Sequence, residues 1–337
     1  MNTSAPKVLV TGAAGFIGAA VAESLLARGE AVIGLDDCNA YYQASLKRDR
    51  LARLREMFGE RFLFIELDIA DTQGLEAALA EHRIERIVHL AAQAGVRYSL
   101  ENPHAYVRSN LAGHVNMLEL ARARGVEHLV YASSSSVYGG NEKLPFAVED
   151  RTDHPVSLYA ATKRADELMS ETYAHLFRLP QTGLRFFTVY GPWGRPDMAM
   201  WKFAERILSG RPIDVFNHGD MYRDFTYIDD IVAGVLGCLD RPPADDGQEK
   251  PGGSVKPHAL YNIGNNRSEY LMRLIAVLEE ACGRKAELNM LPMQPGDVPR
   301  TFADITALAR DIGYVPSTPI EEGVPRFVEW FRGYTGL

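Results

Sequence analysis

Short apolar runs alternate with longer segments of helical periodicity from the start of the chain to about Phe187. The segments between the runs predict helices over Gly15–Arg28, Gly74–His82, Ala105–Arg124 and Ser157–Leu179. Apolar strands separated by helices are typical of a parallel sheet covered on both faces, so we expect an α/β fold with a doubly wound parallel sheet. The runs that predict its strands are Lys7–Thr11, Ala31–Asp36, Phe62–Leu67, Ile87–Ala91, His128–Ser133 and Thr182–Phe187.

Beyond Phe187 the pattern loosens into a turn-rich stretch, Tyr190–Asp197, followed by a predicted helix over Met200–Ser209. A predicted helix, Asp229–Leu239, and a predicted strand, Ala259–Ile263, could return to the main sheet. We therefore expect a first lobe of residues 1–187, joined by 226–263, and a smaller mixed lobe of 188–225 and 264–337. The Pro- and Gly-rich segment 241–257 reads as an exposed loop to which we assign no function.

A glycine-rich turn joins the first predicted strand to the first predicted helix. Gly12, Gly15 and Gly18 have the spacing that lets a backbone turn tightly, approach a pyrophosphate and pack a helix on a strand. The helix N-terminus adds positive potential at the same point. Because the strand before and the helix after are both present, we expect a bound dinucleotide rather than a bare turn.

Three further positions follow strands at the edge where the dinucleotide is expected. Asp36 ends the second strand, where a carboxylate accepts hydrogen bonds from the adenosine ribose and repels a 2′-phosphate, which favours NAD over NADP. Lys47 and the neighbouring Arg48 weigh against that choice. Asp68 could meet the adenine or could cap the next helix. Ala91 and Ala92 are small enough for a dinucleotide to lie against them.

Composition narrows the class of protein. The chain has 337 residues, 46% of them hydrophobic and 24% charged, and its formal net charge of −8 argues against nucleic acid as the main partner. Three distant cysteines indicate reduced thiols, and the polar segment 1–7 lacks the apolar core of a signal peptide, so we expect a cytoplasmic protein. No membrane span is expected, and the scattered histidines indicate no metal site.

Tyr159 and Lys163 lie four residues apart on a predicted helix, so both side chains project from the same face. A phenol has an unperturbed pKa of about 10, too high for a base at neutral pH, and a neighbouring ammonium favours the phenolate. Upstream, Ser133–Ser136 place a row of hydroxyls at the carboxyl edge of the sheet, and Ser134 could share a proton with a substrate hydroxyl.

Together these motifs resemble the extended short-chain dehydrogenase/reductase family of nucleotide-sugar enzymes, from Lys7 to about Trp330. The resemblance implies bound NAD, a C-terminal substrate lobe, and a homodimer built from two long helices per subunit, here Ala105–Arg124 and Ser157–Leu179. The catalytic residues it implies are Tyr159, Lys163 and Ser134. The cofactor contacts we expect are Gly12, Gly15, Phe16, Ile17, Gly18, Asp36, Asp68, Ile69, Ala91, Ala92, Asn110, Ser133, Tyr159 and Lys163.

Within this family the residues after the catalytic serine distinguish enzymes that catalyse different reactions on the sugar. The 4,6-dehydratases carry an Asp-Glu pair and the UDP-glucuronate decarboxylases a Glu, whereas this chain has Ser135 and Ser136, which favours 4-epimerisation. Segments 39–42, 93–98, 188–198 and 294–299 are similar to those of UDP-glucuronate 4-epimerases. The resemblance assigns Arg223 to the nucleotide diphosphate, and Thr188 stands where UDP-galactose 4-epimerases have Asn.

An acidic sugar needs cationic or hydrogen-bonding partners, since its carboxylate would otherwise be buried unpaired. Arg195, between a glycine and a proline, is our candidate for that role, and Arg97 is the alternative. Other readings are a 4-epimerase of another UDP-sugar, a UDP-glucuronate decarboxylase, or an NAD-binding sensor without catalysis. The substrate contacts we expect are Ser134, Ser135, Thr188, Arg195, Arg223, Arg97 and Asp297.

Overall fold

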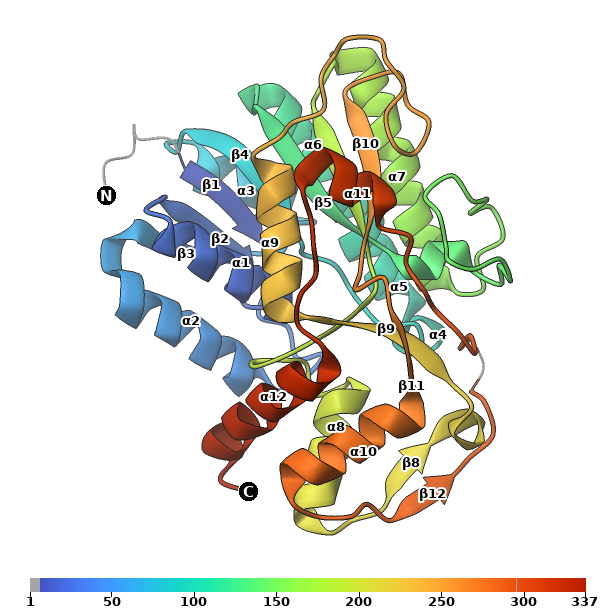
Figure 1. Ribbon diagram of the computed structural model, residues 1–337. Helices are drawn as coiled ribbons and strands as arrows, with labels where there is room; N and C mark the ends of the chain where they lie inside the picture. The colour runs from blue at the N-terminus through green and yellow to red at the C-terminus, as the bar shows by residue number, and fades with distance from the viewer. Residues whose placement is uncertain (1–6, 295) are drawn as a thin grey trace.

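A seven-stranded, fully parallel sheet forms the centre of the computed structural model, which describes residues 7–294 and 296–337 (Figure 1). Its strand order is β10-β6-β5-β4-β1-β2-β3, and this order reverses direction between β1 and β4, as in a doubly wound fold. The predicted α/β class is thus confirmed. The strands are β1 (Lys7–Thr11), β2 (Val32–Asp36), β3 (Phe62–Glu66), β4 (Ile84–His89), β5 (His128–Ser134), β6 (Gln181–Phe186) and β10 (His258–Ile263).

Helices cover both faces of this sheet and form two separate apolar clusters. On one face α1 (Phe16–Ala27) packs against α2 (Ala44–Phe58) and α9 (Ile228–Leu239). On the other face lie α3 (Thr72–Leu79), α6 (Gly113–Arg124) and α7 (Leu158–Phe177). Because both faces are buried, the strands read as continuous apolar runs rather than alternating ones.

The predicted helix Ala105–Arg124 has the expected extent, but it is not regular. It consists of α5 (Pro103–Tyr106), a π-helical segment (Val107–Ala112) and α6. Gly113 lies so close to Ile69 that an added Cβ would be 2.5 Å from the Ile69 Cδ1 atom. The short helix α4 (Tyr98–Glu101) precedes α5. Periodicity alone could not reveal the π-helical turn, which is a local change in hydrogen bonding.

The second group of elements lies at one end of the main sheet (Figure 1). It includes α8 (Ala199–Ser209), which begins one residue before the predicted helix. It also includes two small sheets with strand orders β11-β9-β7 and β12-β8. Helices α10, α11 and α12 of the C-terminal half were not predicted, and neither was α2, which packs on α1 beside the main sheet. The remaining elements are β7 (Thr188–Tyr190), β8 (Ile213–Val215), β9 (Tyr222–Tyr227), β11 (Ser268–Tyr270), α10 (Leu271–Cys282), β12 (Leu288–Met290), α11 (Thr306–Ile312) and α12 (Ile320–Thr335).

Three segments of the C-terminal half pack on the main sheet, and one of them is α11, which contacts α9 and β10. Strand β10 pairs with β6 in register from His258 opposite Gln181 to Ile263 opposite Phe186, and α9 packs on α1. Strand β9 just before α9 belongs to a small sheet instead. The chain therefore crosses between the two groups several times, and the cavity described next lies where they meet. The three cysteines are buried and unpaired.

Candidate active site

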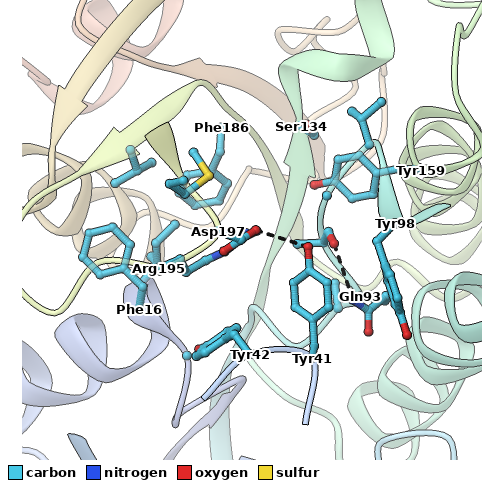
Figure 2. Close-up of a pocket in the computed structure, with 18 of the residues that line it drawn as sticks. Phe16, Tyr41, Tyr42, Gln93, Tyr98, Ser134, Tyr159, Phe186, Arg195 and Asp197 are labelled. Atoms are coloured by element: carbon cyan, nitrogen blue, oxygen red, sulfur yellow. Dashed lines mark hydrogen bonds and ion pairs between the residues drawn. The ribbon is translucent and has the colours of Figure 1, made fainter. Parts of the chain in front are cut away.

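A single cavity of about 860 Å³ is lined by residues of both groups of elements. All but one of the expected cofactor and substrate contacts line it, and the exception is Asn110. Figure 2 shows Tyr159 and Ser134 on one side of this cavity and Phe16, Arg195 and Tyr42 on others. The expected residues that line it are Gly12, Gly15, Phe16, Ile17, Gly18, Asp36, Asp68, Ile69, Ala91, Ala92, Arg97, Ser133, Ser134, Ser135, Tyr159, Lys163, Thr188, Arg195, Arg223 and Asp297.

The glycine turn has the close approaches that a dinucleotide cradle needs. Gly12 has a φ of 72°, and a Cβ there would lie 2.8 Å from the Ala91 nitrogen. A Cβ on Gly18 would lie 2.0 Å from the Gly12 oxygen. Helix α1 begins after Gly15, which supplies no side-chain cap, so the first-turn N–H groups are not taken by a side chain. These residues fit the pyrophosphate of a dinucleotide.

Asp36 ends β2 beside this turn and is held in place by backbone donors. Its carboxylate accepts from the Ala14 nitrogen at 3.1 Å and from the Cys38 nitrogen at 2.9 Å. Burial raises the pKa of Asp36, and the Lys47 amine 4.0 Å away opposes that shift. The carboxylate still lines the cavity, so its remaining lone pairs can accept from ribose hydroxyls.

Asp68 is not the cap of the helix that follows it. That role belongs to Asp71, which accepts from the Gly74 nitrogen at 3.0 Å. Asp68 instead lines the cavity, accepts from the Ala70 nitrogen at 2.8 Å and pairs with Arg108 at 2.7 Å. The capping interpretation of Asp68 was therefore wrong.

Helix α7 carries the expected proton-transfer pair into the cavity. The Ser157 hydroxyl caps this helix by accepting from the Ala160 nitrogen at 3.1 Å, which sets where the first turn begins. Tyr159 and Lys163 follow one turn apart, and both line the cavity. The Lys163 amine donates to the Ala132 oxygen of β5 at 2.9 Å, so the helix and the strand are joined at this point.

The serine row begins at the end of β5. The Ser134 hydroxyl caps the short 3₁₀ turn Ser135–Tyr138 by accepting from the Ser136 nitrogen at 3.2 Å. The Ser133 hydroxyl donates to Glu167 at 2.6 Å, and that carboxylate forms a bidentate pair with Arg185. Burial opposes the charge of Glu167, but Arg185 outweighs it and holds the pKa of this carboxyl below its ordinary value. Both serines line the cavity, but the Ser133 hydroxyl is engaged by this buried pair, whereas the Ser134 hydroxyl bonds within the serine row.

Asn110 is buried behind the cavity rather than in its lining. It lies in the π-helical segment, accepts from the Gln93 nitrogen at 2.8 Å, and donates to the Gln93 oxygen and to the Thr162 hydroxyl. These contacts engage its side-chain oxygen and its amino group. Asn110 therefore supports the turn after β4 and the helix that carries Tyr159. It is not among the residues that line the cavity where the cofactor is expected.

Arg195 reaches the cavity already paired. Its Nε donates to Asp197 at 3.0 Å and its Nη2 donates to the second oxygen of the same carboxylate. Burial disfavours the charge of Asp197, but Arg195 outweighs it and keeps the pKa of Asp197 below its ordinary value. Tyr41 donates to Asp197 from the other side at 3.2 Å (Figure 2). Burial and Asp197 raise the pKa of Tyr41 to about 12, so its hydroxyl remains a donor.

Two arginines and one carboxylate gather at another part of the lining. Arg97 pairs with Asp297 at 3.3 Å and lies over the Phe216 ring at 5.1 Å. Arg223 donates to backbone oxygens, and burial, with Arg97 nearby, lowers its pKa while Asp297 opposes. Of the expected motif 294–299, Pro295 lies outside the described residues.

Three residues that the structure brings to the site were not among the expected contacts, although Lys47 was weighed in the choice between NAD and NADP. Tyr41, Lys47 and Asp197 all line the cavity, and the first two come from the loop and helix after β2. The adjacent tyrosines 41 and 42, next to a strand that ends in Asp36, were the available signal. The contact of Tyr41 with Asp197 spans 156 positions, so no local pattern predicts it.

Residues 7–294 and 296–337 contain no group of three or more His, Cys, Asp or Glu side chains arranged to hold a metal ion. Within the same ranges, none of the helices has both the length and the apolar character required to cross a bilayer.

A doubly wound sheet, a glycine cradle and a Tyr-Lys pair on one cavity define a dinucleotide-dependent enzyme of the α/β class. Residues 8–264 match the model of the NAD dependent epimerase/dehydratase family, and the chain belongs to that family.

Several proteins similar to this chain are named as 4-epimerases of UDP-sugars. A relative from Rhizobium meliloti named probable UDP-glucuronate 4-epimerase is 50% identical over 331 residues, covering 96% of each chain. The UDP-glucuronic acid 4-epimerase of Bacillus cereus, solved with UDP-glucuronic acid and NAD, has a TM-score of 0.85 at 32% identity, covering 97% of this chain and 99% of that one. The UDP-glucose 4-epimerase of Thermotoga maritima, solved with UDP-glucose, scores 0.86 at 31% identity with the same coverage. The backbone therefore does not distinguish the two sugars.

Proposed function

We propose that this chain inverts C4 of UDP-glucuronate to give UDP-galacturonate, with NAD as a resident cofactor. The observation that carries the proposal is the serine row, in which Ser135 and Ser136 follow Ser134 at the cavity. Carboxylates at these positions would instead favour dehydration or decarboxylation of the sugar. The relatives and the solved epimerase with UDP-glucuronic acid support the same choice of sugar.

Tyr159 acts as the base for the sugar hydroxyl at C4. The Lys163 ammonium favours its phenolate, and Ser134 shares a proton with the same hydroxyl. NAD, when bound, takes up the hydride from C4 and supplies it again to the opposite face of the 4-keto sugar. Gly12, Gly15 and Asp36 hold this cofactor at the turn after β1 and at the end of β2.

The sugar carboxylate is met by Arg195. Asp197 occupies two of the five N–H donors of this guanidinium, so the others can serve a second carboxylate. Oxidation at C4 of a glucuronate produces a β-keto acid that loses carbon dioxide readily. A rigid, partly buried arginine keeps the carboxylate in place until C4 is reduced again, and Thr188 adds a hydroxyl on the same cavity.

Inversion requires the 4-keto sugar to turn over while the rest of the nucleotide stays bound. Arg223 anchors the diphosphate, with Arg97 and Asp297 beside it. The cavity of about 860 Å³ is shared by the cofactor, the nucleotide and the sugar. In this assignment Arg97 serves the nucleotide end rather than the sugar carboxylate.

The test is to incubate the purified protein with UDP-glucuronate, without added cofactor, and to follow the sugar anomeric signals by NMR. We expect a UDP-galacturonate signal without carbon dioxide and without lasting NADH absorbance. Loss of carbon dioxide would identify a decarboxylase instead. Turnover of UDP-glucose but not of UDP-glucuronate would identify an epimerase of neutral sugars, and no turnover of either would favour an NAD-binding sensor.

A variant separates the role of Arg195 from the reaction itself. Arg195→Ala should raise the KM for UDP-glucuronate and increase any decarboxylated side product, because the carboxylate loses its charged partner. Arg178→Ala is the matched control, because it removes an exposed arginine that caps the C-terminal end of α7 and pairs with Asp245. Unchanged kinetics and products in Arg195→Ala would contradict this role.

The enzyme works as a cytoplasmic homodimer with two lobes, 1–187 with 226–263, and 188–225 with 264–337. Helix α7 presents Leu168, Leu176 and Phe177 to solvent at 54%, 61% and 44% exposure, and Val107 adds to them at 46%. Exposed apolar side chains on α7 and on the π-helical segment support an interface at these helices. The buried, unpaired cysteines suit a reducing compartment.

A further inference from the structure

The amine of Lys163 is held from two sides. Besides the Ala132 oxygen on β5, it donates to the Asp166 carboxylate, one turn further along α7, at 3.1 Å. The side chains of Lys163 and Asp166 are 4% and 1% exposed. A lysine ammonium has three N–H donors, so the protein engages two of them and the third can serve a ligand in the cavity.

Asp166 is poorly accommodated at this position. Its Oδ1 atom is buried without a hydrogen-bond partner among the described residues, and only Oδ2 is engaged. Burial raises the pKa of Asp166 to about 7, although the Lys163 amine opposes that shift. A buried carboxylate with an unpaired oxygen is costly, so packing and helix stability give no reason for an acid here.

We propose that Asp166 is a positioning residue for the base: it holds the Lys163 ammonium against β5, and its negative charge weakens the pull of that ammonium on Tyr159. This inference rests on the proposed function, in which Tyr159 is the base. Asp166 does not line the cavity, so it acts through Lys163 alone.

The two parts of this role have separable consequences. The hydrogen bond determines where the ammonium stands, and therefore how well it reaches Tyr159 and the cofactor ribose. The charge determines how strongly the ammonium favours the phenolate of Tyr159, because the field of a cation is reduced by a neighbouring anion. The ionised Asp166 carboxylate therefore leaves the phenolate of Tyr159 less stabilised, and so a stronger base, than the ammonium alone would.

The other groups around Asp166 do not supply this compensating charge. Glu167 on the same helix is bound to Arg185 of β6 and to Ser133, so its charge is already balanced. Burial lowers the pKa of His89 on β4 to about 3 and lowers that of His114 on α6 well below its ordinary value, so both rings are neutral. The titratable and charged groups facing Asp166 are Lys163, Glu167, Arg185, His89, His114 and Tyr131.

Two substitutions separate the hydrogen bond from the charge. Asp166→Asn keeps an amide oxygen for Lys163 and removes the charge, whereas Asp166→Leu keeps a similar volume and removes both. Glu171→Gln is the matched control on the same helix, eight residues from Lys163 and about 12 Å along the axis. It removes a carboxylate charge and keeps an amide that can still hydrogen-bond to Ser254 and His258.

The first readout is the ionisation of Tyr159, measured as the tyrosinate absorbance of each protein minus that of the same protein carrying Tyr159→Phe. We expect Asp166→Asn to move this titration to lower pH by about 0.5–1 unit, with Glu171→Gln unchanged. The acid limb of the pH dependence of kcat should move in the same direction. A titration of Asp166→Asn that coincides with that of the unsubstituted protein would overturn the proposal.

The second readout concerns position. Asp166→Leu should lower kcat roughly ten-fold or more and leave the KM for UDP-glucuronate within about two-fold, because the lost contact orients the base rather than the substrate. An unchanged kcat would overturn the positioning role, and if Asp166→Leu does not fold, the titration of Asp166→Asn decides alone. The titration uses no sugar. A shifted titration in Asp166→Asn, together with no turnover of any UDP-sugar, would therefore contradict the proposed function and not this inference.

Discussion

Three alanine substitutions of glycine should separate two physical demands on the cofactor turn. Gly12 needs both a positive φ of 72° and room, since its Cβ would lie 2.8 Å from backbone atoms of the turn after β4. Gly18 needs room alone, because its Cβ would lie 2.0 Å from the Gly12 oxygen. Gly29 needs conformation alone, with a φ of 95° and nothing within 4 Å of the added atom.

The magnitudes follow from these geometries. Gly29→Ala should cost about 1–2 kcal/mol, the usual penalty for a left-handed residue with a side chain. Gly18→Ala should cost at least about 1–3 kcal/mol, because a backbone oxygen must move away from the new atom. Gly12→Ala combines both effects, so we expect roughly 2–5 kcal/mol.

The assay is the thermal unfolding midpoint together with the NAD content of each purified protein. Gly12→Ala and Gly18→Ala should lose stability and carry less NAD, since the turn that holds the pyrophosphate is displaced. Gly29→Ala should lose stability only. The reasoning would be refuted by Gly18→Ala with normal stability and NAD content, or by NAD loss in Gly29→Ala as large as in Gly12→Ala.

Three further predictions concern other contacts of the site. Glu167→Gln leaves the Arg185 guanidinium buried without its counter-charge, which should cost about 3–5 kcal/mol in urea unfolding. Because Glu167 has a pKa below its ordinary 4.5 in the folded protein, its contribution is fully present above about pH 4.5 and is lost as the pH falls through the folded value, so the difference between unsubstituted protein and variant should shrink in acid. Tyr41→Phe removes one donor to Asp197 and should change the KM for UDP-glucuronate by up to about ten-fold, and an unchanged value would mean that this contact does not shape the sugar site. If the proposed homodimer forms through α7, Leu176→Glu should yield monomers in light scattering, and a persistent dimer would place the interface elsewhere.

Local pattern predicts well those elements that are buried by ordinary apolar packing, because such packing needs no particular distant partner. The strand Lys7–Thr11 has the predicted bounds, and the predicted Thr182–Phe187 differs from β6 by one residue at each end. Helix α2 went unpredicted because its buried positions include Lys47 and Arg50, which interrupt the apolar stripe. Arg50 is buried because it donates to the Ala14, Trp193 and Gly194 backbone oxygens, and these partners meet it only in the folded chain.

The sequence by itself determined the α/β class, the glycine turn and the placement of Tyr159 and Lys163 one turn apart on a helix, because each depends on periodicity or spacing along the chain. Only the tertiary structure decided which charges are already balanced. Asp197 pairs with Arg195, Asp166 holds Lys163 with one oxygen unpaired, and Tyr41 crosses from another element. Burial and through-space contact set those energies, and neither can be read from the order of residues.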